Sequence, residues 1–289
     1  MDQMRYEAPK SLDAAVALLK GEEGEACVLA GGTDVLVLLH CDIIEPDLVV
    51  DIKHIPETMA ISESDGVWTV GAAMPAMEIV DNEAFSKAWP GVIDGVKLIG
   101  SIQIKGRASI GGNLCNASPA ADGVPPLIVA GAVATVIGPG GTREIAVEDV
   151  VTGPRETSLA RDEIIVSFTF PKRPPHSGDA YQRFTPRTEM DIAVVGVSVN
   201  VTLDDDGVCT AARVSLCAVA PTPLLVADAA AALIGSTGDG AALAKMAEAA
   251  RAACNPINDK RGTVEYRIKV TGVLAERVAR DAFERARQN

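Results

Sequence analysis

Two short segments, Leu29-Ala30-Gly31-Gly32-Thr33-Asp34 and Ser109-Ile110-Gly111-Gly112-Asn113-Leu114-Cys115, each place a glycine pair in apolar surroundings. Glycine has no Cβ, so a glycine-rich loop lets several backbone N–H groups approach one anion closely. A single Gly-Gly pair is also common in ordinary turns. Two such pairs in one chain predict that a large phosphate-bearing cofactor is held from two sides.

The first glycine pair lies inside a predicted β-α-β-α-β unit. Ser11 is a suitable N-cap for a helix that ends near Gly21. Apolar runs at 26–29 and 48–52 indicate short buried strands, and a second helix begins near Asp34. Alternating strands and helices favour a small parallel or mixed sheet. The first glycine pair thus follows a strand and precedes a helix, which aims its N–H groups at an anion.

The next part of the chain, up to the Pro-rich segment, predicts mainly strands with a few helices. Strands are predicted at 67–70, 133–137, 143–147 and 164–170, and helices at 76–80 and 88–99. The run Gly138-Pro139-Gly140-Gly141 predicts a hairpin turn, because Arg143 stands where a Gly-x-Gly-x-x-Gly dinucleotide motif needs glycine. The Pro-rich segment 171–178 predicts a linker.

The segment after the linker predicts an antiparallel sheet with helices. Two strands, 192–203 and 208–220, flank the turn Asp204-Asp205-Asp206-Gly207. Helices are predicted at 224–234, 240–253 and 262–286. We therefore expect an α+β protein with an N-terminal domain at 1–176, divided into subdomains 1–56 and 57–176, and a C-terminal domain at 177–289.

The composition narrows the classes of partner. The chain has 289 residues and is 48% hydrophobic, so sizeable cores can form although only 3% of residues are aromatic. Its formal net charge of −13 argues against a nucleic-acid partner. An anionic cofactor must then be held by local dipoles and by nearby cations such as Lys105 and Arg107. No apolar signal region or membrane-spanning stretch is evident, so we expect a soluble cytoplasmic protein.

The cysteines and histidines do not predict a metal site. The cysteines show no Cys-x-x-Cys spacing, and the histidines show no spacing typical of metal ligands. These residues are Cys27, Cys41, Cys115, Cys209, Cys217, Cys254, His40, His54 and His176. We expect most of the cysteines to be reduced and buried.

Polar residues around the second glycine pair extend the predicted site. Ser109 and Asn113 carry short side chains that can hydrogen-bond phosphate or hydroxyl oxygens. Asp122 can accept hydrogen bonds from sugar or ribityl hydroxyls. Nanomolar retention requires about 12 kcal/mol, whereas a neutral hydrogen bond contributes about 0.5–1.5 kcal/mol. Apolar burial of flat rings must therefore contribute. The candidate walls, each of which could equally be plain core, are Leu29, Ile110, Leu114 and Ile165.

Taken together, these segments resemble a known family. Residues 30–34 and 109–113 look like the two FAD loops of the medium, flavoprotein subunit of molybdenum hydroxylases, the xanthine dehydrogenase and carbon monoxide dehydrogenase family. Further segments are similar to the family's flavin-side strand, the start of its C-terminal domain and its last helix. They are 162–167, 183–187 with 190–193, and 265–267. The resemblance covers essentially the whole chain, in order.

The resemblance implies a fold and a set of cofactor contacts. The fold is a two-part FAD-binding domain of the vanillyl-alcohol oxidase (PCMH) type followed by the family's C-terminal α+β domain. Backbone N–H groups of 30–34 would bind the pyrophosphate, and 109–113 would bind the other side of the cofactor. Ile165 would place its backbone against the isoalloxazine. The implied cofactor-binding residues are Ala30, Gly31, Gly32, Thr33, Asp34, Ser109, Ile110, Gly111, Gly112, Asn113, Asp122, Ile165 and Arg183.

Three departures from related proteins refine this expectation. Thr33 stands where some FAD proteins of the wider fold attach the flavin through histidine, so the resemblance implies non-covalent FAD. The cysteine-rich insertion that gives some relatives an extra iron–sulfur cluster is missing, so none is expected in this chain. Ile192 stands where some relatives carry an aromatic residue against the flavin ring.

The role implied by the resemblance is electron transfer. A large molybdopterin subunit would hydroxylate a substrate, a small [2Fe–2S] subunit would pass electrons to FAD, and FAD would reduce an external acceptor, in a dimer of heterotrimers. No catalytic residue is then expected in this chain. Two alternatives stay open. The first is a self-contained FAD oxidase or dehydrogenase with Glu189 or Asp191 as general base, although solvated turn charges explain both residues more simply. The second is a non-catalytic phosphate-binding or scaffold protein.

Overall fold

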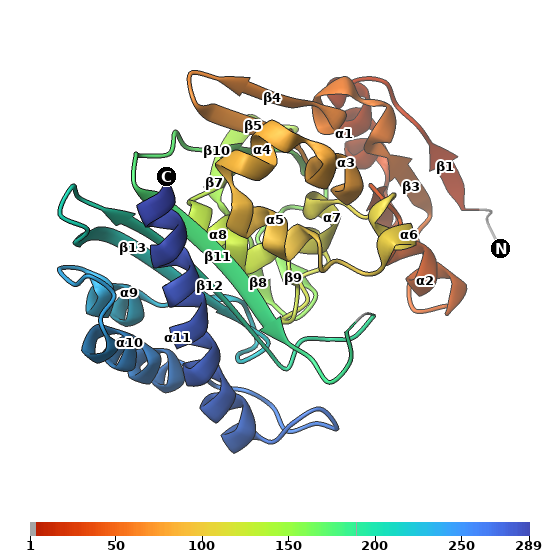
Figure 1. Cartoon of the computed structure of the whole chain (residues 1–289). Helices are drawn as coiled ribbons and strands as arrows, with labels where there is room; N and C mark the ends of the chain where they lie inside the picture. Colours follow the sequence, from red (N-terminus) through yellow and green to blue (C-terminus); the bar gives the residue numbers. More distant parts are fainter. Residues whose placement is uncertain (1–3, 189) are drawn as a thin grey trace.

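The N-terminal part of the protein is a small parallel sheet with two helices, seen here in a computed structural model that describes residues 4–188 and 190–289 (Figure 1). Its strand order is β1-β3-β2, and both pairings are parallel. Ser11 caps α1 by accepting a hydrogen bond from the Ala14 N–H at 3.3 Å. The predicted β-α-β-α-β unit is thus confirmed. Its elements are β1 (Arg5–Glu7), α1 (Leu12–Gly21), β2 (Ala26–Leu29), α2 (Val35–His40) and β3 (Leu48–Asp51).

A five-stranded antiparallel sheet forms the centre of the first domain. Its order is β4-β5-β10-β6-β7. Gly138 pairs with Gly141 at the end of β6 and β7, which confirms the predicted hairpin turn. The strands are β4 (Ile61–Ser64), β5 (Val67–Gly71), β6 (Val133–Gly138), β7 (Gly141–Ala146) and β10 (Ile164–Phe170). Two short 3-10 turns, Ile52–His54 and Pro56–Met59, join this sheet to the N-terminal one.

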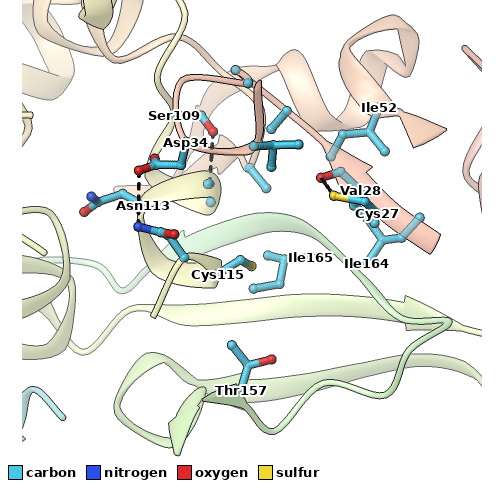
Figure 2. A pocket seen from close by; sticks show the side chains of 18 of the residues that line it. Cys27, Val28, Asp34, Ile52, Ser109, Asn113, Cys115, Thr157, Ile164 and Ile165 are labelled. Atoms are coloured by element: carbon cyan, nitrogen blue, oxygen red, sulfur yellow. Dashed lines mark hydrogen bonds between the residues drawn. The ribbon is translucent and has the colours of Figure 1, made fainter. Parts of the chain in front are cut away.

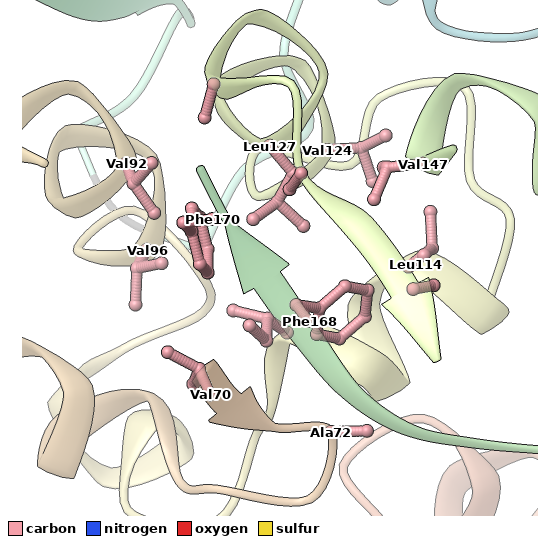
Figure 3. Packing of buried hydrophobic residues seen from close by; sticks show 14 of the residues in the cluster. Val70, Ala72, Val92, Val96, Leu114, Val124, Leu127, Val147, Phe168 and Phe170 are labelled. Carbon is pink, nitrogen blue, oxygen red and sulfur yellow. The ribbon is translucent and has the colours of Figure 1, made fainter. Parts of the chain in front are cut away.

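Short helices pack on this sheet around a mainly aliphatic core that includes Phe168 and Phe170 (Figure 3). Phe85 contacts Phe170 edge to face at 5.1 Å between ring centroids. The helix predicted at 88–99 is shorter in the structure: Ala88 ends α4, Pro90 begins α5, and α5 ends at Val96. The helices are α3 (Ala76–Asp81), α4 (Glu83–Ala88), α5 (Pro90–Val96), α6 (Ile102–Lys105), α7 (Ile110–Cys115) and α8 (Val124–Ala130). Between β7 and β10 lie the 3-10 turn Val147–Asp149 and the hairpin of β8 (Val151–Gly153) and β9 (Glu156–Thr157).

The C-terminal part is a four-stranded antiparallel sheet covered by helices. In Figure 1 the last helix, α11, runs along β11 and β12. The turn at 204–207 is confirmed, but the strand predicted from 192 begins at Val195. The elements are β11 (Ser177–Phe184), β12 (Val195–Leu203), β13 (Cys209–Cys217), β14 (Leu224–Leu225), α9 (Ala227–Leu233), α10 (Gly240–Ala252) and α11 (Val264–Gln288).

Helix α8 joins the two parts, because every residue in it is buried and it packs on β12 and β13. Its last carbonyls accept hydrogen bonds from the second sheet: Asn200 Nδ2 donates to Val129 O and Arg213 Nε donates to Ile128 O, both at 3.0 Å. Helix α8 therefore attaches the first domain to the C-terminal sheet. No helix in residues 4–188 and 190–289 is long and apolar enough to cross a membrane.

Candidate cofactor site

A cavity of about 510 Å³ opens between the loop after β2, helix α7 and the segment that enters β10 (Figure 2). Both glycine segments line it, so the structure brings them together although they are far apart in sequence. Small-molecule sites typically fall in this size range. The lining contains these residues of the implied set: Ala30, Gly31, Gly32, Thr33, Asp34, Ser109, Gly111, Gly112, Asn113 and Ile165.

The first glycine loop offers unpaired backbone donors. Within residues 4–188 and 190–289, the N–H groups from Gly31 to Asp34 donate no hydrogen bond to a protein acceptor. Polar backbone groups in proteins are nearly always paired with protein, water or ligand. The loop is nevertheless fixed in place, because Lys53 Nζ donates to Ala30 O and contacts Asp51 Oδ1, each at 2.7 Å. This combination of a fixed loop and free donors suits an anionic ligand.

Gly31 allows the two glycine segments to approach each other. A Cβ on Gly31 would lie 1.9 Å from the Arg107 carbonyl oxygen, just before the second segment. Gly32 has a different requirement, since its φ of +79° lies in the left-handed region that favours glycine. Asn116 Nδ2 donates to Asp34 Oδ1 at 3.3 Å, which links the two loops through side chains.

The second glycine segment begins helix α7, and three of its N–H groups donate hydrogen bonds within the protein. Ser109 caps α7 by accepting from the Gly112 N–H at 3.1 Å, and the Asn113 N–H donates to Ser109 O at 2.9 Å. The Gly111 N–H donates to Ala72 O at 3.1 Å. Gly111, Gly112 and Asn113 thus use their N–H groups within the protein, whereas the N–H groups of Ser109 and Ile110 donate to no protein acceptor in residues 4–188 and 190–289. The second segment contributes its glycine surface, since a Cβ on Gly112 would meet only Ser109 Oγ, at 3.2 Å.

The apolar walls of the cavity differ from those predicted. Ile110 and Leu114 are at most 1% exposed and pack into the core of the first domain, so their side chains do not form a wall. Leu29 is buried and outside the lining. Ile165 does line the cavity as predicted. Apolar neighbours that the sequence did not single out complete this wall, and they are Val28, Ile52 and Ile164 (Figure 2).

Asp122 and Arg183 lie outside the cavity lining and bind each other. An Arg183 guanidinium nitrogen donates to Asp122 Oδ2, and Tyr181 Oη donates to Asp122 Oδ1 at 2.7 Å. Burial raises the pKa of Asp122 to about 6, against the opposing influence of Arg183 and Tyr181. The cluster joins the segment before α8 to β11. It is linked to the cavity through the next residue, because the Gly123 N–H donates to Asn113 Oδ1 at 3.0 Å.

Comparison with known families decides what kind of site this is. Residues 2–173 match the family described as FAD binding domain in molybdopterin dehydrogenase, and residues 180–282 match the CO dehydrogenase flavoprotein C-terminal domain. The first match alone spans more than half of the chain. The chain belongs to the FAD-binding medium subunits of the molybdenum hydroxylases.

Individual relatives are similar in sequence to this flavoprotein subunit over nearly its full length. It is 31% identical to the carbon monoxide dehydrogenase medium chain of Afipia carboxidovorans, over 98% of this chain and 97% of that protein. It is 29% identical to the xanthine dehydrogenase FAD-binding subunit of Escherichia coli, over 99% and 98% of the two chains. The fold matches a chain of carbon monoxide dehydrogenase from Hydrogenophaga pseudoflava with a TM-score of 0.93 and 30% identity, covering 98% of each.

The cations beside the cavity of the flavoprotein subunit are also not those predicted. Neither Lys105 nor Arg107 lines it, and Lys105 Nζ is buried and donates to Lys97 O at 2.9 Å. The arginines in the lining are Arg155 and Arg161. Both belong to the loop region between β8 and β10, which carried no recognised motif. Only the folded arrangement brings them to the glycine loops.

The residues considered for a general base do not support that role. Glu189 lies outside the described residues. Asp191 forms ion pairs with Arg261 at 3.3 Å and Arg187 at 3.8 Å. Although burial raises the pKa of Asp191, the Ile192 N–H and these arginines outweigh it and hold the pKa below its usual value. A carboxylate stabilised in its charged form is a weaker base.

Proposed function

We propose that this flavoprotein subunit binds FAD non-covalently in the cavity, takes electrons from a [2Fe–2S] partner and passes them to an external acceptor. The observation that carries the proposal is the first glycine loop, whose four N–H groups from Gly31 to Asp34 have no protein acceptor in the described part of the chain. Unpaired N–H groups converging on a cavity suit the diphosphate of FAD.

The residues present fit FAD in shape as well as in charge. Gly112 leaves the cavity side of α7 open, and Val28, Ile52 and Ile165 offer apolar surface for a flat ring. Thr33 offers no nucleophilic nitrogen for attachment of the flavin. When bound, FAD supplies the redox chemistry, and the protein holds and orients it. The implied contacts of Asp122 and Arg183 remain part of this proposal.

The proposed complex follows from the family. Relatives include a medium chain of carbon monoxide dehydrogenase, and one solved relative is a Cu,Mo-CO dehydrogenase. We infer a small iron–sulfur partner and a large molybdopterin partner, assembled as a dimer of heterotrimers in the cytoplasm. Within the chain we place the domain boundary between residues 176 and 177. A self-contained oxidase is disfavoured by the ion-paired state of Asp191.

Purification of the chain alone, followed by acid precipitation, tests the cofactor proposal. We expect a flavin absorption spectrum and release of all flavin to the supernatant. Flavin retained in the pellet would contradict non-covalent binding, and a colourless protein that cannot be reconstituted with FAD would contradict the function itself. Co-expression with the neighbouring genes then tests the partners: the chain should co-purify with an iron–sulfur protein and a molybdopterin protein. Substrate turnover by the isolated chain would refute the electron-transfer role.

A further inference from the structure

The turn between β8 and β9 holds an arginine in an unusual backbone conformation beside the cavity. Arg155 follows Pro154 in this two-residue turn and has a φ of +63°. Non-glycine residues adopt this left-handed conformation at a cost of about 1 kcal/mol or more. Glycine would adopt this turn conformation without that cost. The turn geometry therefore does not explain why a long cationic side chain occupies this position.

The turn is anchored to the end of the second glycine segment. The Arg155 N–H donates to Ala117 O at 3.1 Å, two residues beyond α7. Behind the turn, the Ser158 N–H donates to Val150 O at 2.9 Å and Ser158 Oγ donates to Asp149 O at 2.9 Å. These bonds fix the backbone from which the Arg155 side chain extends into the cavity lining.

The Arg155 guanidinium is available for a ligand, unlike the other charged groups in the lining. Arg161 is occupied, because one of its nitrogens donates to Glu22 O and Gly24 O, each at 2.7 Å. Glu163 is paired with Arg143 at 2.7 Å. Across residues 4–188 and 190–289, the Arg155 guanidinium has no hydrogen-bonded or ion-paired partner.

Arg155 also offsets the charge that most opposes an anion at the first glycine loop. The Asp34 carboxylate lies on that loop, where burial raises its pKa while the positive charge of Arg155 lowers it. Arg155 and Asp34 both line the cavity, so the two opposite charges share one ligand space. In a chain of net charge −13, a phosphate next to Asp34 needs a cation at this point.

We propose that Arg155, on the β8–β9 turn, binds the diphosphate of the cofactor and offsets the negative charge of Asp34. Arg155 would thereby select dinucleotide flavins over flavins that lack a diphosphate. This assignment rests on the proposed FAD function. Guanidinium groups bind phosphate oxygens through two parallel N–H donors, which an ammonium cannot reproduce. The free N–H groups of the first loop and Arg155 then act on one anion.

Titration of the full-length apo chain with FAD, ADP and riboflavin tests this proposal. Arg155→Gln is expected to weaken FAD and ADP binding by about 10- to 100-fold, the usual effect of a lost charge-assisted hydrogen bond. Riboflavin, which carries no phosphate, should bind as it does to the wild type. Arg155→Lys should recover part of the affinity. Lys269→Gln on α11 is the matched control, because it removes the same charge from an exposed site distant in sequence.

The outcomes separate this proposal from the function on which it rests. Equal weakening of all three ligands by Arg155→Gln, or equal behaviour of Arg155→Gln and Lys269→Gln, would overturn the role of Arg155 while leaving FAD binding intact. Wild-type binding of ADP without FAD would overturn the flavin function but not the diphosphate assignment. Binding of none of the three would overturn both. Thermal unfolding of the apo variants should match the wild type, since Arg155 is exposed.

Discussion

Replacement of Gly31 by alanine tests whether the two glycine segments must touch for the site to exist. The φ of Gly31 is not in the left-handed region, so alanine introduces no backbone strain of its own. The new Cβ would nevertheless lie 1.9 Å from the carbonyl oxygen and 2.6 Å from the carbonyl carbon of Arg107. Both neighbours are backbone atoms, which cannot rotate away. One of the two segments must therefore move by more than about 1 Å.

Two costs follow from that movement. Overpacking of a fixed backbone contact lowers the free energy of unfolding by about 1–3 kcal/mol. The movement also displaces the free N–H groups of the first loop from the cofactor. Loss of one hydrogen bond to a charged phosphate costs about 1.5–3 kcal/mol, which corresponds to about a 10- to 100-fold weaker affinity for FAD.

Urea unfolding of the apo chain and FAD titration measure the two costs separately. For the stability measurement, Gly112→Ala is the matched control, because its Cβ would meet only Ser109 Oγ, at 3.2 Å. Alanine in helix α7 should leave stability unchanged or raise it by about 0.5–1 kcal/mol. Wild-type stability and FAD affinity in Gly31→Ala would refute the reasoning. So would an equal loss of stability in Gly112→Ala.

Three further predictions concern residues away from the cavity. Tyr181→Phe removes the hydroxyl that donates to buried Asp122, so urea unfolding should show a loss of about 1–3 kcal/mol; a loss below about 0.5 kcal/mol would contradict this. Arg267→Leu leaves the Val194 and Ala218 carbonyls without this donor, while Asp259 keeps the N–H donors of Arg261 and Gly262; we expect a loss of about 2–5 kcal/mol, whereas a neutral effect would contradict the buried contact. Asp239 caps α10, and the N–H groups of Ala242 and Ala241 hold its pKa below the usual value. Its charge therefore stabilises the fold above the unfolded pKa, and the advantage over Asp239→Asn should disappear as pH falls through the folded pKa in thermal unfolding.

The fold was predictable where the pattern is local. The strands at 26–29 and 48–52, with Ser11 as a helix cap, follow from periodicity and capping, and the structure confirms them. Strand β11 was missed because Ser177-Gly178-Asp179 has the composition of a turn. Gly178 is needed there for tertiary packing, since a Cβ would lie 2.1 Å from Ala282 O on α11. This contact joins residues that are far apart in sequence, so local sequence patterns could not predict it.

The site was predictable as a pair of segments but not in its division of roles. The glycine pairs indicated converging N–H groups on both sides, whereas the Gly112 N–H is used by Ser109. A serine before a helix is a capping signal that could have shown this. Arg155 carried no sequence signal, because its place depends on the anchoring of its turn to Ala117. Lys105 is close in sequence to the second glycine pair, but its ammonium group donates to Lys97 O rather than facing the cavity.

The structure assigns the two glycines of each pair to different tasks. The first glycine packs against another backbone: a Cβ would lie 1.9 Å from Arg107 O for Gly31 and 2.4 Å from Ala72 O for Gly111. The second glycine shapes the ligand side, through the positive φ of Gly32 and the open face of Gly112. Substitution of the first glycine of a pair should therefore lower both the free energy of unfolding and the affinity for FAD. A side chain at Gly112 should lower the affinity for FAD alone. Comparing the two quantities for each variant thus distinguishes glycines that build the cavity from glycines that contact the cofactor.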